Sequence, residues 1–93
     1  MCYAVYIIYS ESTDSFYKGQ TQDLDNRILR HNNGWEISTR HGIPWKLVWS
    51  TVKPDRSSAI RLESKLKNLS RERLIDFIRK NSQAVAGPDD PDR

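Results

Sequence analysis

The stretch Ala4-Val5-Tyr6-Ile7-Ile8-Tyr9 decides the fold, together with the segment 16–21 (Phe-Tyr-Lys-Gly-Gln-Thr) that follows it after a polar run. Side chains alternate between the two faces of a strand, and here both faces carry apolar residues. Such a strand lies in the middle of a sheet. The polar run from Ser10 to Ser15 supplies a turn, so we expect the second segment to return beside the first as a hairpin.

A helix is predicted directly after the hairpin. Thr21 or Asp23 can cap its first turn, and the sequence Asn32-Asn33-Gly34 is typical of a helix end. Arg27 and His31 are four residues apart, so their side chains share one helical face. That face borders the apolar stripe, and both side chains are therefore expected to lean toward the sheet.

The remaining elements are expected in the order strand, helix, helix. We predict no regular structure from Trp35 to Gly42, a third strand from Pro44 to Val52, a helix from Ser58 to about Leu66 capped by Asp55 or Ser57, and a last helix that Ser70 caps. The order β-β-α-β-α-α predicts an α+β domain with a small three-stranded antiparallel sheet flanked by three helices. We expect this domain to cover residues 1–81 and residues 82–93 to form a disordered C-terminal tail.

Composition limits the classes of protein to which the chain can belong. Its 93 residues suffice for one small domain, and no apolar run approaches the roughly 20 residues of a membrane span. The first residues lack the basic region of a signal peptide, and the single cysteine, Cys2, cannot form an internal disulfide. We therefore expect a cytoplasmic protein.

The charge of the chain is uneven. The net charge is +3, but residues 1–81 carry 14 basic against 9 acidic side chains, or +5, and residues 53–80 alone carry nine basic against four acidic ones. A polyanionic partner such as nucleic acid explains this excess. The alternative is that lysine and arginine on helical surfaces serve solubility alone.

The predicted fold gathers side chains that phosphodiester hydrolysis requires. Tyr6, Tyr17, Arg27 and His31 meet if the first helix packs beside the hairpin, and Glu63 can approach from the second helix. A carboxylate can hold a divalent cation, an arginine can neutralise charge in the transition state, and a phenol or imidazole can take a proton from water. With one carboxylate we expect one ion, Mg²⁺ or Mn²⁺, that keeps several waters.

The identity of the general base stays open. An unperturbed tyrosine has a pKa near ~10, so it can serve only where neighbouring cations lower that pKa, and Arg27, Lys18 and the metal ion are candidates. A histidine with a pKa near ~6.5 is ready at neutral pH. The sequence leaves Tyr6, Tyr17 and His31 as alternatives.

With these residues in order, the chain resembles the GIY-YIG nucleases, in particular the small stand-alone bacterial type. Ala4-Val5-Tyr6 stands for the first motif and Tyr17-Lys18-Gly19 for the second. The resemblance continues over roughly residues 3–80, through the sets Thr21, Asp23-Leu24, Arg27, His31-Asn32, then Pro44-Trp45-Lys46-Leu47-Val48, Glu63-Ser64-Lys65-Leu66-Lys67 and Ser70-Arg71. Two auxiliary positions depart from the family: Gln20 where some members have lysine, and Ile75 where many have asparagine.

The resemblance implies metal-dependent endonucleolytic cleavage of nucleic acid, which we expect to be DNA, and a possible structure-selective role in DNA repair or processing. It implies active-site roles for both motif tyrosines, a phosphate contact for Arg27, a site role for His31 and metal binding by Glu63. The residues that we expect to contact nucleic acid are Lys18, Gly19, Arg30, Lys65 and Lys67.

Two other functions are weighed against this one. The first is a nucleic-acid-binding module with little or no cleavage, which the departures at Gln20 and Ile75 favour. The second is a protein-interaction domain that keeps the nuclease fold. Individually, Arg27 and His31 could be a solvated helical face, and Glu63 could simply pair with Lys67 four residues further on.

Overall fold

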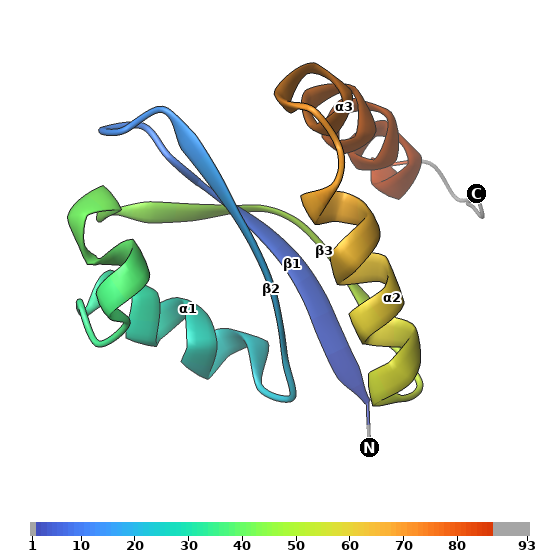
Figure 1. Cartoon of the computed structure of the whole chain (residues 1–93), viewed down its shortest axis with the longest axis horizontal. Helices are drawn as coiled ribbons and strands as arrows, with labels where there is room; N and C mark the ends of the chain where they lie inside the picture. The colour runs from blue at the N-terminus through green and yellow to red at the C-terminus, as the bar shows by residue number, and fades with distance from the viewer. Residues whose placement is uncertain (1, 87–93) are drawn as a thin grey trace.

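The computed structural model describes residues 2–86, with side chains for residues 2–81. Its elements are β1 (Tyr3–Ser10), β2 (Ser15–Thr21), α1 (Leu24–Asn32), the 3₁₀ helix η1 (Ile37–Gly42), β3 (Trp45–Lys53), α2 (Arg56–Lys67) and α3 (Arg71–Ala86) (Figure 1). The predicted α+β class, with a three-stranded antiparallel sheet and three α-helices, is confirmed. Within the described residues, no helix combines the length and apolar character needed to cross a membrane.

β1 is the central strand of the sheet, as its two apolar faces predict. The strand order is β2-β1-β3, and both pairings are antiparallel. Tyr6 pairs with Gly19, and Ile8 pairs with Tyr17. This register places Tyr6, Ile8 and Tyr17 on one face of the sheet, because residues two apart on a strand share a face.

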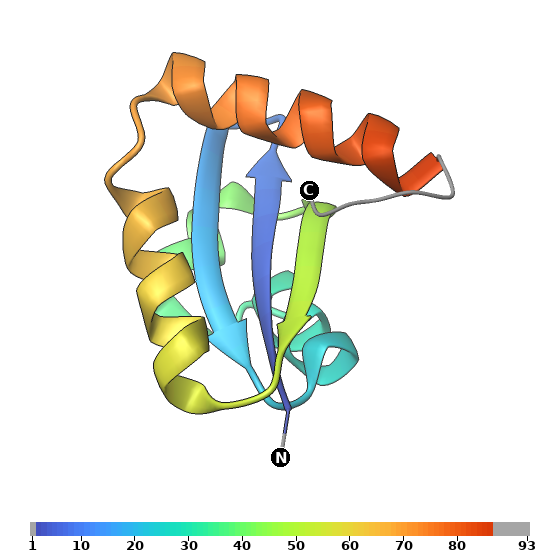
Figure 2. The same ribbon diagram turned by 90° about the vertical axis from the view of Figure 1, so that its right-hand side faces the viewer.

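Each face of the sheet has its own apolar core. Val5 and Ile7 pack with Ala59, Leu66 and Leu74 from α2 and α3. On the other face, the buried residues Tyr6, Ile8 and Trp45 pack with partly buried residues of β2, α1 and the segment before β3: Tyr17, Leu24, Ile28 and Ile43. The sheet therefore separates α1 from α2 and α3, and Figures 1 and 2 show these elements on its two sides.

Several boundaries differ from the predicted ones. Residues 37–42, predicted to be irregular, form η1, where Thr39 N–H donates to the Glu36 carbonyl at 3.2 Å. So short a helix has no apolar repeat by which a sequence could reveal it. α2 begins at Arg56 because Asp55 caps it. α3 continues to Ala86, into the segment predicted to be a tail, and residues 87–93 lie outside the described residues.

The tip of the hairpin is tied to α3. Asp14 has a positive φ of 53°, and its carboxylate accepts a hydrogen bond from the Tyr9 hydroxyl at 2.6 Å. The same oxygen lies 2.7 Å from the Arg71 guanidinium, which also lies over the Phe16 ring. The Tyr9 hydroxyl thus holds the hairpin tip, whereas Tyr6 and Tyr17 lie in the core on the α1 face of the sheet.

Candidate active site

Tyr6, Tyr17 and His31 form a ring cluster on the α1 face of the sheet. The ring centroids lie 6.4 Å apart for Tyr6 and Tyr17, 5.9 Å for Tyr6 and His31, and 5.1 Å for Tyr17 and His31. Asp23, the N-cap of α1, accepts from Asn26 N–H and fixes where the helix starts. The last turn of α1 then brings His31 over the hairpin, so these three predicted site residues do meet.

His31 is held by a hydrogen bond on each ring nitrogen. Nε2 lies 3.0 Å from the Tyr6 hydroxyl, and Nδ1 lies 2.7 Å from Thr39 Oγ1. The Thr39 hydroxyl gives its own hydrogen to the Glu36 carbonyl in a longer contact of 3.4 Å, so it accepts from Nδ1–H. The neutral imidazole then has its lone pair on Nε2, and the Tyr6 hydroxyl donates to it.

Thr39→Val is expected to weaken this arrangement. Thr39 and His31 are each 1% exposed, so the substitution leaves a buried Nδ1–H without its acceptor. The expected loss is about 1–3 kcal/mol of unfolding free energy, measured by urea titration. The ¹⁵N chemical shifts of His31 should also show a mixture of tautomers in place of one.

Thr39→Ser is the matched control, because serine keeps the acceptor oxygen. It should retain most of the stability and the single tautomer. Equal stability and an unchanged tautomer in Thr39→Val would show that Thr39 does not orient His31.

Burial shifts the pKa values of the inner pair. The pKa of Tyr6 is raised to about 12, mainly by burial and next by the neighbouring Tyr17. Arg27 acts in the opposite direction and lowers this pKa. Burial also lowers the pKa of His31, which stays neutral at physiological pH. Tyr6 therefore keeps its proton at neutral pH in the metal-free protein, and neither residue of the pair faces solvent.

Tyr17 is the accessible phenol of the cluster. Its side chain is only partly buried, and none of the described residues hydrogen-bonds its hydroxyl. Its ring is fixed by edge contacts with His31 and with Trp45, whose centroid is 6.5 Å away. A rigid ring with a free hydroxyl is suited to meet a ligand atom, so Tyr17 is the phenol that a substrate can reach.

Gly19 is required for the close approach of Tyr6. An added Cβ at Gly19 would lie 2.6 Å from the Tyr6 hydroxyl oxygen and 2.7 Å from Cζ. Gly19 is itself buried under the ring. Its role here is to admit the phenol, and its expected contact with nucleic acid stays a prediction.

Gly19→Ala should therefore destabilise the fold by about 1–3 kcal/mol, because Tyr6 is fully buried and its hydroxyl is held by His31. Urea unfolding measures the loss. In a Tyr6→Phe background the same substitution should cost less unfolding free energy, because the hydroxyl oxygen nearest to the added Cβ is gone. Equal costs in both backgrounds would contradict the clash as the cause.

Arg27 lies on α1 one turn before His31 and is partly buried. It favours the ionised form of Tyr6 through a side-chain hydrogen bond and its charge, so its guanidinium faces the ring cluster. No carboxylate among the described residues forms an ion pair with it. A partly buried cation without a counter-ion is suited to bind an anion from solution.

Glu63 projects from α2 toward the β2 edge of the sheet. Its Oε1 accepts from Gln20 Nε2 at 2.9 Å, and its Oε2 lies 3.1 Å from Lys67 Nζ. The ion pair with Lys67 is the one that the spacing of four residues on a helix allows. Gln20, a departure from the family at an auxiliary position, holds this carboxylate. The Glu63 charge contributes to the raised pKa of Tyr6, so it acts on the ring cluster.

The donor set at Glu63 suits a single hard cation. A carboxylate offers about four lone-pair positions, of which Gln20 and Lys67 use two, and Lys67 is 57% exposed and free to turn away. Within the described residues, no three His, Cys, Asp or Glu side chains gather into a metal-binding group. Glu63 fits an ion such as Mg²⁺ that takes one carboxylate and keeps its waters.

The remaining basic residues lie around this site in different ways. Lys18 pairs with Ile7 in the register, on the opposite face of the sheet from Tyr17, so it does not belong to the ring cluster. Arg30 forms an ion pair with Glu36 at 2.9 Å. Lys65 is exposed on α2, two residues after Glu63.

This α+β scaffold thus places a buried phenol–imidazole pair beside a free phenol and an arginine without a counter-ion, groups suited to an anionic substrate. The model of the GIY-YIG catalytic domain matches residues 2–76, and the chain belongs to that family. Nucleases of this family act on nucleic acid and generally use a divalent metal ion.

Similar proteins share the UPF0213 name. UPF0213 protein BH0048 of Halalkalibacterium halodurans is 36% identical over 80 residues, which cover 84% of this chain and 83% of that protein. UPF0213 protein XAC3202 of Xanthomonas axonopodis is 36% identical over 72 residues, or 76% of this chain and 71% of the relative. The match to the solution NMR structure of BH0048 covers 95% of this chain and 89% of the BH0048 chain, with a TM-score of 0.49.

Proposed function

We propose that this protein is a metal-dependent endonuclease that hydrolyses DNA phosphodiester bonds at the Tyr17–Arg27 surface. One observation carries the proposal: the Tyr17 hydroxyl and the Arg27 guanidinium lie beside the same buried Tyr6–His31 pair, no described residue hydrogen-bonds the Tyr17 hydroxyl, and no described carboxylate forms an ion pair with Arg27. A phosphodiester supplies the anion that Arg27 would bind, and solvent supplies the water that Tyr17 would meet.

In this proposal each residue has a distinct task. Arg27 binds the scissile phosphate and neutralises the charge that builds up on its oxygens during attack. Tyr17, the reachable phenol, would take the proton of the attacking water as a phenolate, after losing its own proton to solvent. The hydrogen bonds from Tyr6 to His31 and from His31 to Thr39 hold the buried rings beneath Tyr17 in one orientation. Glu63 would hold the metal ion, which supplies Lewis acidity at a phosphate oxygen when bound.

Basic residues outside the ring cluster are proposed to bind the flanking DNA backbone. Lys65 and Lys67 lie on the same helix as Glu63, and Lys67 reaches its carboxylate. Lys18 lies on the opposite face of the sheet from Tyr17, and Arg30 pairs with Glu36, so both would contact phosphates outside the ring cluster. Neutralising several phosphates releases counter-ions, so binding should weaken steeply with salt.

The proposed setting is the processing or repair of nicked and branched DNA in the cytoplasm, with Mg²⁺ or Mn²⁺ as the ion. Cys2 is exposed and free, as in a reducing compartment. The test is incubation with plasmid, nicked, flap and junction DNA, with and without each metal. Metal-dependent cleavage of at least one substrate is expected, and no cleavage of any of them would contradict the proposal.

A second candidate is a nucleic-acid-binding module without cleavage. The observation in its favour is that Gln20 and Lys67 already satisfy both oxygens of Glu63. In addition, the apolar Ile75, where many family members have asparagine, lines a groove with Tyr9 and Phe16. Salt-sensitive DNA binding that Tyr17→Phe leaves unchanged, without cleavage, would select this candidate.

A further inference from the structure

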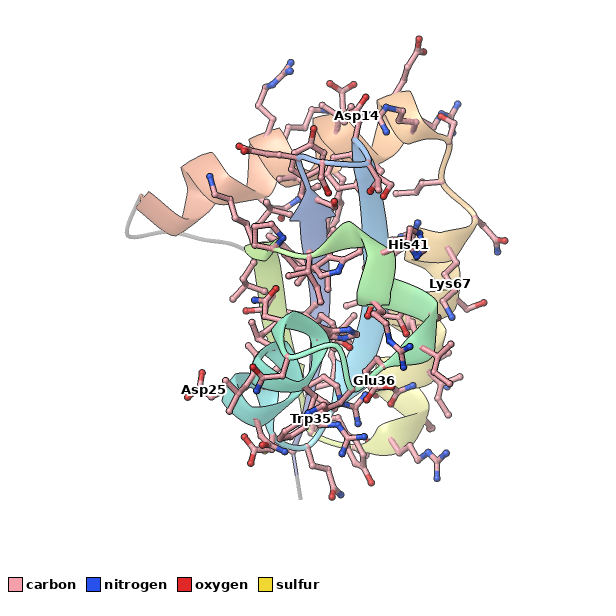
Figure 3. The ribbon with its side chains drawn as sticks, turned by 90° about the vertical axis from the view of Figure 1, so that its left-hand side faces the viewer. Asp14, Asp25, Trp35, Glu36, His41 and Lys67 are labelled. Atoms are coloured by element: carbon pink, nitrogen blue, oxygen red, sulfur yellow. The ribbon has the colours of Figure 1, made fainter. Side chains whose placement is uncertain are left out.

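Two large apolar side chains stand in solvent next to the site. Trp35 is 60% exposed and lies in the segment that joins α1 to η1, and Ile37, the first residue of η1, is 79% exposed. Figure 3 shows Trp35 beside Glu36 on the side of the molecule formed by α1 and η1. Neighbouring exposed apolar residues of this size mark interaction surfaces more often than single ones do.

The segment is held rigidly although its side chains are exposed. Gly34, with a φ of 78°, donates to the His31 carbonyl, and Trp35 N–H donates to the Arg30 carbonyl at 3.0 Å, which is the hydrogen-bond pattern of a Schellman motif. The Arg30–Glu36 ion pair spans the segment at 2.9 Å, and Arg40 Nε donates to the Gly34 carbonyl. Trp35 is thus presented in a fixed backbone conformation.

The segment is also anchored to the proposed phosphate site at both ends. His31 precedes Trp35 by four residues, so their Cα atoms are at most about 14 Å apart. At ~3.4 Å per base step along one strand, this distance corresponds to about four steps. On the other side of Trp35, Thr39 in η1 also contacts His31, because its Oγ1 lies 2.7 Å from His31 Nδ1.

The charge around Trp35 favours nucleic acid over an apolar protein partner. Residues 27–42 carry three arginines against one glutamate, a net +2, and that glutamate is neutralised by Arg30. An aromatic ring flanked by cations is the arrangement on which nucleobases stack, because every base offers a π-face and every nucleotide a phosphate.

We propose that Trp35 is a stacking platform for an unpaired nucleobase of the substrate, a few nucleotides from the phosphate held by Arg27, with Ile37 as an apolar wall beside it. This inference rests on the proposed function and narrows it to DNA that contains unpaired bases. A fully paired duplex keeps its bases stacked on one another and cannot use the platform.

The test measures dissociation constants by fluorescence anisotropy in EDTA, so that no cleavage occurs. The probes are two labelled duplexes of equal length, one fully paired and one with a two-nucleotide bulge. Trp35→Ala should weaken binding of the bulged duplex about tenfold, as expected for the loss of one stacked base, and change the paired duplex little. Trp35→Phe should keep most of the affinity. Val52→Ala, which removes an exposed apolar side chain of β3, is the control and should change neither.

Each other outcome overturns the proposal. Unchanged affinity of Trp35→Ala for the bulged duplex, or an equal loss on both duplexes, would show that no base stacks there, while cleavage by the wild type would still support the nuclease function. If the wild type binds neither duplex at low salt, the proposed function fails together with this inference. Thermal unfolding followed by circular dichroism confirms that each variant is folded.

Discussion

Glu63→Gln is expected to lower the rate of DNA cleavage by about 10²–10⁴-fold. The several kcal/mol that a metal ion contributes to a phosphoryl transition state require the negative carboxylate, and each ~1.4 kcal/mol is a factor of ten in rate. Glutamine keeps the size of the side chain and an oxygen that can accept from Gln20 Nε2. Stability should therefore change by less than about 1 kcal/mol, because Lys67, the partner whose ion pair is lost, is 57% exposed and can be solvated by water instead.

The measurement is the single-turnover rate as a function of Mg²⁺ concentration. Glu36→Gln is the matched control, since Glu36 is also partly buried and ion-paired but lies on the α1–η1 side. It should leave the metal dependence unchanged. A Glu63→Gln enzyme with the wild-type rate and the wild-type metal dependence would remove Glu63 from the mechanism.

Tyr17→Phe is expected to reduce cleavage by about 10²–10⁴-fold, the range of general acid–base catalysis. The hydroxyl has no hydrogen-bond partner among the described residues, so its removal should alter the unfolding free energy by no more than about 0.5 kcal/mol. The ring contacts with His31 and Trp45 do not involve the hydroxyl and remain. The expected signature is a folded protein that binds DNA normally and cleaves it slowly.

Tyr9→Phe is the control for this substitution. Tyr9 lies near the end of β1, and its hydroxyl donates to Asp14 at the hairpin tip. Its loss should affect stability and leave the cleavage rate at the wild-type value. If Tyr17→Phe and Tyr9→Phe cleave equally fast, Tyr17 is not the proton acceptor.

The sequence was sufficient to predict the hairpin and the helix after it, because their signals are local. β1 is apolar on both faces, and a central strand has no other pattern. The cap at Asp23 and the stop at Gly34 bound α1, and the four-residue spacing of Arg27 and His31 placed both on the face that turns to the sheet. These features follow from neighbours in the chain.

The hydrogen-bond partners in the site could not be predicted, because they come from distant segments. The sequence predicts no regular structure around Thr39, and only the packing of η1 against α1 brings its hydroxyl to His31. Gln20 meets Glu63 across 43 positions of sequence. Lys18 was expected near Tyr17, yet adjacent strand residues point to opposite faces, so the register separates them.

The most direct test of the central claim is one cleavage assay. Wild-type protein and Glu63→Gln are mixed in excess with labelled branched DNA, with Mg²⁺ or with EDTA, and the product is followed with time. The proposed mechanism predicts product only for the wild type with Mg²⁺, with at least a hundredfold loss in the variant. Product formed equally by both proteins, or formed in EDTA, would contradict it.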